Sequence, residues 1–365
     1  MIPSDTHFMT LALDLGRQAL GATWPNPAVG CVIVSGDEIV GQGHTAPGGR
    51  PHAETVALDQ AGARARGATA YVSLEPCAHH GKTPPCAEAL IKAGVVRVVS
   101  TLEDDDSRVS GRGFAMLRAA GIEVVTGVLA DEAARDLAGF FHRIATGRPL
   151  VTLKLAMSLD GRIATASGHS QWITGESARA EVHALRVCHD AVMIGAGTAR
   201  ADDPALTVRG RAVLRPPVRV VVSRRLDVPL LGQLARTARQ VPVWMCHGRD
   251  ADAALISAWQ GLGARLIACD LTGRHLDMDC VLQDLGQAGL TRVLCEGGGA
   301  LAASLLAEDL VDEMVIFTAG FAIGAEGRPG IGALGLARLD EALRFDLHDL
   351  RRVGDDILHH WLRRD

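Results

Sequence analysis

Apolar positions in the first 145 residues alternate between the spacing of helices and that of strands. Residues 5–20 repeat apolar side chains every three or four positions, as an amphipathic helix does. Apolar runs at 28–34 and 38–44 flank the turn sequence SGD like a hairpin. We expect further helices at 52–62, 86–94, 113–121 and 131–146, and strands at 69–76, 96–102 and 122–129. Strands that alternate with helical crossovers predict an α/β sandwich with parallel strands.

The segment ATGRPLVTLKLA interrupts this alternation, because Gly147 and Pro149 precede a new strand. A chain of 365 residues is also longer than one hydrophobic core usually serves. We therefore expect two domains, residues 1–147 and 148–365. In the second, strands are expected at 150–158, 190–197, 218–223, 241–246 and 292–299, helices at 177–188, 230–238 and 300–308, and closing edge strands at 312–319 and 356–364.

Composition limits the class of protein. Apolar residues make up 48% and charged residues 22%, as in an ordinary globular protein. The net charge of −5 disfavours a nucleic-acid binder, which needs a basic face. The N-terminus lacks the features of a secretory signal, and no apolar run approaches the ~20 residues of a membrane span. The eight cysteines are too sparse for a disulfide scaffold, so a cytoplasmic location is expected.

One constellation in the first half is typical of a catalytic metal site. His52 opens an expected helix with Glu54 two residues later, Cys77 follows a strand, and Cys86 opens the next helix. Helix N-termini favour thiolates. One imidazole and two thiolates leave one tetrahedral zinc position open, as catalytic zinc requires. Glu54 is then free to act as the proton shuttle, and the order H-x-E, P-C, C is that of zinc deaminases.

The loop between the two cysteines contains rival candidates. His79 and His80 are alternative zinc ligands, and either of them could make a structural site with four protein ligands. Because they lie in the middle of the loop, we expect them, or Lys82, to contact substrate instead. Taken singly, each of these residues is more often a surface or packing residue; the prediction depends on their combination and order.

The second half carries polar residues that core packing does not require. Lys154, Ser158 and Asp160 have even spacing and are expected on one face of a strand. Ser223 follows the strand 218–222, where it could contact an adenosine ribose. Three glycines at 297–299 lie between a strand and a helix, where backbone N–H groups can approach a pyrophosphate. The same glycines would equally suit a tight turn.

The motifs PNPAVGCVIV, GRPHAE and EPCAHHGKTPPC closely resemble the bifunctional deaminase/reductase family of riboflavin biosynthesis, the RibD or RibG type. The resemblance implies zinc ligands at His52, Cys77 and Cys86, proton transfer by Glu54, and Asn26 lining the base pocket. It implies hydrolysis of the 2-amino group of a diaminopyrimidinone ribosyl 5′-phosphate. The family often has D-P-[ND]-P where residues 104–108 read DDDSR, which puts the shape of that loop in doubt.

KLAMSLDGRIA, SQWITG and EGGGALAASLL extend the resemblance to the family's reductase domain, so it covers essentially the whole chain. The implied fold is a cytidine-deaminase-like α/β/α sandwich followed by a dihydrofolate-reductase-like α/β domain. Lys154 is a separate candidate for a catalytic residue, which could pass a proton. The implied NADPH contacts are Ala156, Trp172, Thr198, Asp202, Gly298, Gly299, Ala300, Leu301, Ala302, Ala303 and Ser304. The implied substrate contacts are Ser170, Arg186, Leu206, Arg209 and Glu296. The guanidinium groups of Arg186 and Arg209 are suited to binding a ribose 5′-phosphate.

Three other readings remain open. The chain could be a deaminase alone, with a second half that resembles a reductase but is not catalytic. It could edit single-stranded nucleic acid, although the acidic balance and the 4% aromatic content disfavour base stacking. It could also hold a purely structural zinc. We expect a small-molecule pyrimidine ribosyl phosphate as substrate, no nucleic-acid or membrane partner, and a homo-oligomer, dimer or tetramer.

Overall fold

The computed structural model describes residues 5–80, 84–106 and 109–364. The chain divides into two compact units, residues 1–146 and 147–365, and each is described by itself. Among the described residues, no helix is both long enough and apolar enough to cross a membrane. Lys82, Ser107 and Arg108 lie outside the described residues.

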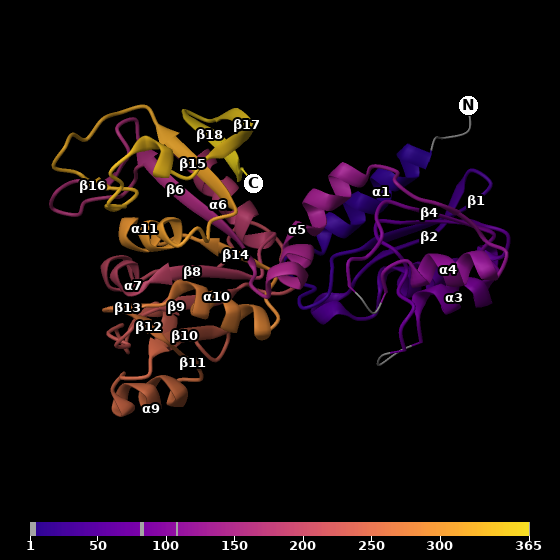
Figure 1. Ribbon diagram of the computed structural model, residues 1–365, viewed down its shortest axis with the longest axis horizontal. Coiled ribbons are helices and arrows are strands. Elements are labelled where there is room, and N and C mark those ends of the chain that lie inside the picture. Colours follow the sequence, from indigo (N-terminus) through magenta and orange to yellow (C-terminus); the bar gives the residue numbers. More distant parts are fainter. Residues whose placement is uncertain (1–4, 81–83, 107–108, 365) are drawn as a thin grey trace. The chain divides into compact units, whose positions relative to one another are not determined.

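Unit 1 is a five-stranded sheet in the order β2-β1-β3-β4-β5, with helices on both faces (Figure 1). β1 pairs antiparallel with β2, which confirms the expected hairpin, and also antiparallel with β3, whereas β3, β4 and β5 run parallel to one another, as expected for strands joined by helical crossovers. The elements are α1 (Asp5–Gln18), β1 (Gly30–Ser35), β2 (Glu38–His44), α2 (Ala53–Ala61), β3 (Thr69–Val72), α3 (Cys86–Ala93), β4 (Arg97–Ser100), α4 (Arg112–Ala119), β5 (Glu123–Val125) and α5 (Ala130–Thr146), with 3-10 turns at Pro47–Gly49 and Gly62–Ala65.

Alternation along β1 divides the core of unit 1 into two layers. Cys31 and Ile33 pack with residues of α2, α3 and α4, whereas Val32 and Val34 pack with residues of α1 and the start of α5. Successive strand residues point to opposite faces, and each face here is covered by helices. This is why the central strands read as nearly continuous apolar runs rather than alternating ones.

Unit 2 is built on a nine-stranded sheet in the order β11-β10-β9-β8-β14-β6-β15-β18-β17. The first seven strands in this order are parallel, while β18 and β17 are antiparallel additions. Its main helices and strands are β6 (Leu150–Ser158), α6 (Glu176–Val187), β8 (Ala191–Gly195), α7 (Ala196–Asp202), β9 (Val218–Val222), α8 (Gln233–Arg236), β10 (Val243–Gly248), α9 (Ala253–Gly261), β11 (Arg265–Cys269), α10 (Met278–Gln287), β14 (Arg292–Cys295), α11 (Gly299–Ala307), β15 (Glu313–Ala319), β17 (Phe345–Val353) and β18 (Asp356–Arg363). Smaller pieces are β7 (Arg162–Ala164), β12 (Leu271–Thr272), β13 (His275–Leu276), β16 (Arg328–Pro329) and a 3-10 turn at Leu339–Glu341.

Three predictions about unit 2 were wrong. β15 and β18 were both expected as edge strands, but both lie inside the sheet, and the edge on that side is β17, which the sequence did not indicate. The helix expected over 230–238 is reduced to Gln233–Arg236. Asp160 lies beyond the end of β6 and accepts hydrogen bonds from Ser158 Oγ and the backbone N–H groups of Ile323 and Gly324.

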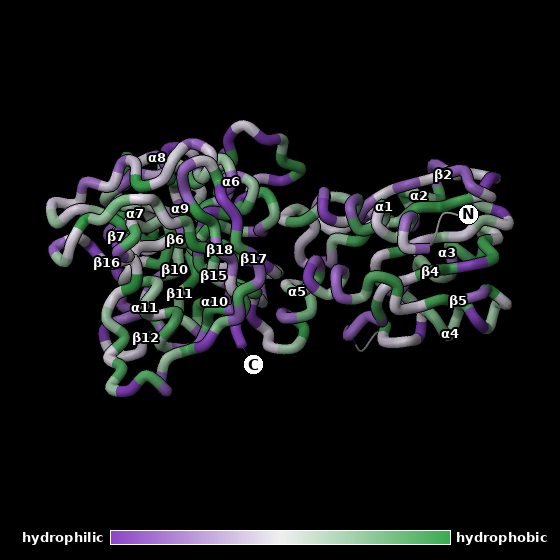
Figure 2. The backbone as a smooth tube through the Cα atoms, turned by 90° about the horizontal axis from the view of Figure 1, so that it is seen from above, coloured by the Kyte–Doolittle hydropathy of each residue, from purple (hydrophilic) through white to green (hydrophobic). Residues whose placement is uncertain are grey.

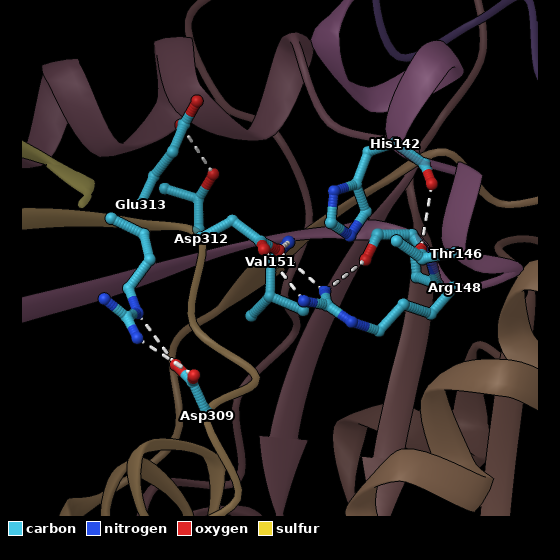
Figure 3. A network of polar contacts seen from close by, with 10 residues as sticks. His142, Thr146, Arg148, Val151, Asp309, Asp312 and Glu313 are labelled. Atoms are coloured by element: carbon cyan, nitrogen blue, oxygen red, sulfur yellow. Dashed lines mark hydrogen bonds and ion pairs between the residues drawn. The ribbon is translucent and has the colours of Figure 1, made fainter. Parts of the chain in front are cut away.

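A polar network fixes the beginning of β6 against β15 (Figure 3). Arg148 donates from Nη1 and Nη2 to the two carboxylate oxygens of Asp312, at 2.7 and 2.8 Å, and the backbone N–H of Val151 donates to the same carboxylate at 2.7 Å. This bidentate geometry aligns the two strands in register. The central strands themselves are mainly hydrophobic, as their green colour in Figure 2 shows.

Candidate active sites

His52, Cys77 and Cys86 come together at the N-terminal ends of two helices of unit 1. His52 is the N-cap of α2, Cys86 begins α3, and Cys77 lies in the loop after β3. His52 Nδ1 lies 3.3 Å from Cys86 Sγ and 3.6 Å from Cys77 Sγ, and all three ligand atoms are within 4.8 Å of one another. Among the described residues, neither His79 nor His80 belongs to this group, and His80 instead faces Glu88 at 3.4 Å.

The charges at this site favour a thiolate. The pKa of the Cys77 thiol is lowered to about 4, chiefly because the Cys86 thiol donates a hydrogen bond to it, and the same contact raises the pKa of Cys86. The backbone N–H of Cys86 also donates to Cys77 Sγ at 3.3 Å. One imidazole and two sulfurs, of which one is readily ionised, form a donor set that fits Zn²⁺.

Glu54 lies in the first turn of α2 and is 4% exposed. Burial, followed by the nearby charge of Cys77, raises the pKa of its carboxyl group. A buried carboxyl group with a raised pKa can both accept and return a proton near neutral pH, which is what a proton shuttle must do.

A cavity of about 310 Å³ opens beside these residues and is lined by His52, Glu54 and Cys77. Asn26 also lines it; its Nδ2 donates to the carbonyl of Gly49 at 3.1 Å and lies 3.4 Å from His52 Nε2. The sequence analysis did not identify several other lining residues, namely Arg50, Asp104, Asp106, Phe140, Arg143 and Ile144. Asp104 lies in the loop after the carboxyl end of β4, where binding sites of α/β sheets commonly form, so its position could have predicted it as a lining residue. Phe140, Arg143 and Ile144 lie on α5, and nothing in their sequence positions indicates that they line a site.

A second cluster lies in unit 2, where Lys154 on β6 is close to Arg186 and Glu296. Arg186 Nε and Nη2 donate to the carboxylate of Glu296 at 2.6 and 2.9 Å, and Arg186 Nη1 donates to the carbonyl of Thr207 at 2.8 Å. Burial lowers the pKa of Lys154, and the charge of Glu296 opposes that shift. Burial acts to raise the pKa of Glu296, but the charge and hydrogen bonds of Arg186 outweigh it, so the net shift is downward.

The glycine turn before α11 has more than one physical explanation. A Cβ atom on Gly299 would lie 2.5 Å from the backbone carbonyl oxygen of Pro329, so packing alone requires this glycine, whereas one on Gly297 would lie 2.6 Å from the Leu301 side chain, which can move. Gly298 is the N-cap of α11, and its N–H donates to Thr198 Oγ1 at 3.2 Å. The helix N-terminus and Thr198 on α7 are thus neighbours, an arrangement that can accept a phosphate.

The remaining candidates of unit 2 differ in accessibility. Trp172 is 68% exposed, with the guanidinium of Arg179 4.7 Å from its ring centroid. Ser223 is 2% exposed, and its hydroxyl donates to Asp227. Leu206 is buried and has a positive φ of 53°. Of the other candidates, Asp202, Arg209 and Ala300 are exposed, Ala156, Ser170 and Ser304 are half-buried, and Leu301, Ala302 and Ala303 are buried.

Comparisons with known proteins match both units. Residues 3–102 match the cytidine and deoxycytidylate deaminase zinc-binding region, and residues 149–359 match the RibD C-terminal domain. The chain is 40% identical to the riboflavin biosynthesis protein RibD of Escherichia coli, over 98% of each chain. The chain belongs to the RibD family of bifunctional deaminase/reductases. Membership confirms the predicted fold class, with a cytidine-deaminase-like region followed by a dihydrofolate-reductase-like region, and the expected zinc and NADPH as cofactors.

Solved RibD structures agree with this assignment. The RibD of Acinetobacter baumannii, in form 1, is 38% identical, covers 100% of both chains and superposes with a TM-score of 0.88. A Thermotoga maritima protein is 31% identical over 98% of both chains, with a TM-score of 0.86. It is described as a diaminohydroxyphosphoribosylaminopyrimidine deaminase/5-amino-6-(5-phosphoribosylamino)uracil reductase. Relatives of this family therefore span the same two regions as this chain.

Proposed function

We propose that this RibD-family protein catalyses two successive steps of riboflavin biosynthesis. The first is hydrolytic deamination of 2,5-diamino-6-ribosylamino-4(3H)-pyrimidinone 5′-phosphate, and the second is NADPH-dependent reduction of the ribosyl to a ribityl chain, giving 5-amino-6-ribitylaminouracil 5′-phosphate. The observation that carries the first step is the group His52, Cys77 and Cys86, with buried Glu54 beside it in one cavity. We assign the deamination to residues 1–147 and the reduction to residues 148–365.

In the first site, His52, Cys77 and Cys86 would hold the zinc ion, which when bound would lower the pKa of water from about 16 towards about 7. Glu54 takes the proton released by the attacking water and returns it to the leaving amine, so that C2–NH₂ and H₂O become C2=O and NH₃. Asn26 lies against His52 and the Gly49 carbonyl, and from there it orients the pyrimidine in the cavity.

In the second site, the N-terminus of α11 and Thr198 would hold the phosphates of NADPH, and Ala156, Trp172, Asp202, Ser223 and the residues up to Ser304 would make further contacts. When bound, NADPH would supply the hydride that reduces C1′ of the sugar. Glu296 and Lys154 lie close together in this site, and the amine of Lys154 would provide the proton that accompanies reduction. The depressed pKa of Lys154 supports this role, because a buried amine gives up its proton more readily than an exposed one.

Substrate binding in unit 2 is assigned to Ser170, Arg186, Leu206, Arg209 and Glu296. The three donor atoms of Arg186 described above contact Glu296 and Thr207, so Arg186 acts by holding Glu296 and the 206–209 segment in place. Exposed Arg209 is then the better cation for the 5′-phosphate. The alternative, a deaminase whose second half is not catalytic, gives no reason for the Lys154, Arg186 and Glu296 cluster to be preserved.

The test follows ammonia release and loss of NADPH absorbance together, on the zinc-replete full-length protein with the diaminopyrimidinone ribosyl phosphate. We expect both signals, with NADPH oxidation lagging behind ammonia. After removal of zinc with a chelator, ammonia release should stop, while supplied deaminated intermediate should still be reduced. Ammonia without NADPH oxidation would favour the monofunctional alternative, and neither signal would reject the substrate.

Two further properties are proposed. A homo-oligomer, dimer or tetramer, is supported by the edge strand β17, where Leu347 and Leu350 are 50% and 61% exposed. Light scattering of the purified protein tests this, and a monomer at micromolar concentration would reject it. A cytoplasmic location is supported by the eight cysteines, all of which are free thiols in the structure.

A further inference from the structure

Glu75, two residues before the zinc-site Cys77, is a buried carboxylate at the junction of three segments. It is 3% exposed and carries no role in the chemistry described above. Its Oε1 accepts hydrogen bonds from the backbone N–H groups of Gly113 and Phe114, at 2.8 and 3.2 Å. Its Oε2 accepts from those of Gly111 and Asp104, at 2.9 and 3.1 Å. Each oxygen therefore has two donors.

Three of these four donors belong to the N-terminus of α4. A helix leaves its first N–H groups without partners inside the helix, and a side chain at the N-cap usually satisfies one of them. Here the N-cap is Gly111, which has no side chain, and Glu75 supplies the acceptors from a distant part of the sequence. The negative charge of the carboxylate also interacts favourably with the positive end of the helix dipole.

The same contact brings α4 against the chain that leads into Cys77. A Cβ atom on Gly113 would lie only 1.9 Å from the carbonyl oxygen of Pro76, so the helix backbone touches this residue directly. On the other side, the carbonyl of Cys77 accepts from the N–H of Ala87 on α3 at 3.2 Å. The Cys77 backbone is thus held between α4 and α3.

The fourth donor links Glu75 to the cavity wall. Asp104, whose N–H donates to Oε2, lines the cavity beside the His52, Cys77 and Cys86 group. Glu75 itself also lines this cavity, so one carboxylate there joins two backbone segments beside it, the Pro76–Cys77 segment and the loop after β4. Neighbours of this kind, which do not touch the metal, determine how precisely a ligand is oriented.

We propose that Glu75 is a positioning residue for the zinc site, which sets the orientation of the Cys77 thiolate by joining the Pro76–Cys77 segment to the N-terminus of α4. The inference rests on the proposed zinc site. It requires a carboxylate and not merely a polar side chain, since both oxygens must accept. An amide of the same shape can accept on one side only and would direct its NH₂ group at two N–H donors.

The experiment compares the full-length Glu75→Gln and Glu75→Asp variants with Glu103→Gln, which removes the same charge from an exposed side chain nearby whose Oε1 accepts from Ser110. Zinc affinity is measured by chelator competition, and the thiolate-to-metal absorption bands are recorded after substitution with Co²⁺. We expect Glu75→Gln to raise the zinc dissociation constant about tenfold or more. Its cobalt bands should shift, whereas Glu75→Asp should lie between it and wild type.

Reductase activity serves as the internal control and should stay within about twofold of wild type in every variant. A purely structural role would lower thermal stability but leave the spectrum per bound cobalt unchanged. Wild-type zinc affinity and unaltered cobalt bands in Glu75→Gln would overturn the inference. If Glu75→Gln does not fold, an unchanged zinc dissociation constant in Glu75→Asp overturns it instead. A wild-type protein that takes up no zinc would reject the proposed zinc site itself.

Discussion

Arg186 and Glu296 form a bidentate ion pair, although they are 110 residues apart in the sequence. Arg186 projects from α6 and Glu296 follows β14, and their side chains are only 14% and 10% exposed. The third contact of the guanidinium, to the Thr207 carbonyl, extends the pair to the segment that contains Leu206 and Arg209. One planar group therefore fixes two parts of the second site, next to Lys154.

Replacing this guanidinium by an ammonium tests the geometry without removing the charge. We expect Arg186→Lys to lower reductase kcat/KM about 10- to 100-fold, because a lysine cannot make the bidentate contact and Glu296 loses its orientation. Deaminase activity should be unchanged. Arg351→Lys is the matched control, since Arg351 contacts Glu181 on the exposed side of the same helix at 3.1 Å. Equal reductase rates in both variants would contradict the assignment.

Glu54 is predicted to move protons without binding the metal. Glu54→Gln should therefore retain one zinc ion per chain, by metal analysis, while ammonia release falls by a factor of about 10² to 10⁴. NADPH-dependent reduction of the supplied intermediate should continue. Glu88→Gln, at an exposed position on α3, controls for loss of charge. A zinc-loaded Glu54→Gln protein with full deaminase activity would falsify the proton-shuttle role.

Gly48 and Gly49 allow a matched test of Asn26. Both have positive φ, 75° and 90°, so alanine is strained at either position. A Cβ on Gly49 would lie 2.6 Å from Asn26 Cγ, whereas one on Gly48 would have nothing within 4 Å. We expect Gly49→Ala to raise the deaminase KM about tenfold by displacing Asn26, and Gly48→Ala to leave it near wild type. The steady-state kinetics of ammonia release measure both, and identical KM values would exclude Asn26 as a substrate contact.

Asp104 should make the stability of unit 1 depend on pH. Burial raises the pKa of its carboxyl group to about 6, above the value of about 3.9 in unfolded chains. Between these two pH values the folded state binds more protons than the unfolded state, so the free energy of unfolding falls as pH rises. Above pH ~6 the carboxyl group is ionised in both states, and the loss of stability is complete. Asp104→Asn should remove this loss of stability. Relative to wild type, its free energy of unfolding should therefore be higher at pH ~8 than at pH ~4, by at most about 3 kcal/mol.

Chemical denaturation at the two pH values measures this difference for Asp104→Asn. The new amide oxygen can still accept from the N–H of Asp106, as the carboxylate does at 2.9 Å, so the local backbone should not change. Asp105→Asn, at the exposed neighbouring position, should show no such pH-dependent gain. A gain of equal size in both variants would mean that general charge repulsion, and not burial of Asp104, is responsible.

Much of the fold could be predicted because both sheets are covered by helices and their strands are marked by apolar runs. β1, β6 and β14 lie where these runs occur in the sequence. β17 could not be found in this way, because six of its nine residues are exposed and only Val353 is buried. β15 was misplaced for a related reason: its apolar pattern indicates a strand but not which neighbours it has.

The sequence by itself determined the chemistry of the metal site. His52, Glu54, Cys77 and Cys86 stand in a fixed order, each beside an expected helix start or strand end, and in the structure the three expected ligands lie within 4.8 Å of one another. Only the tertiary structure decided what surrounds these residues. The four N–H donors on Glu75, the α5 side chains in the cavity and the pairing of Arg186 with Glu296 join segments that are far apart in the chain. Such contacts depend on how the elements pack, and a pattern that is read along one chain does not contain that information.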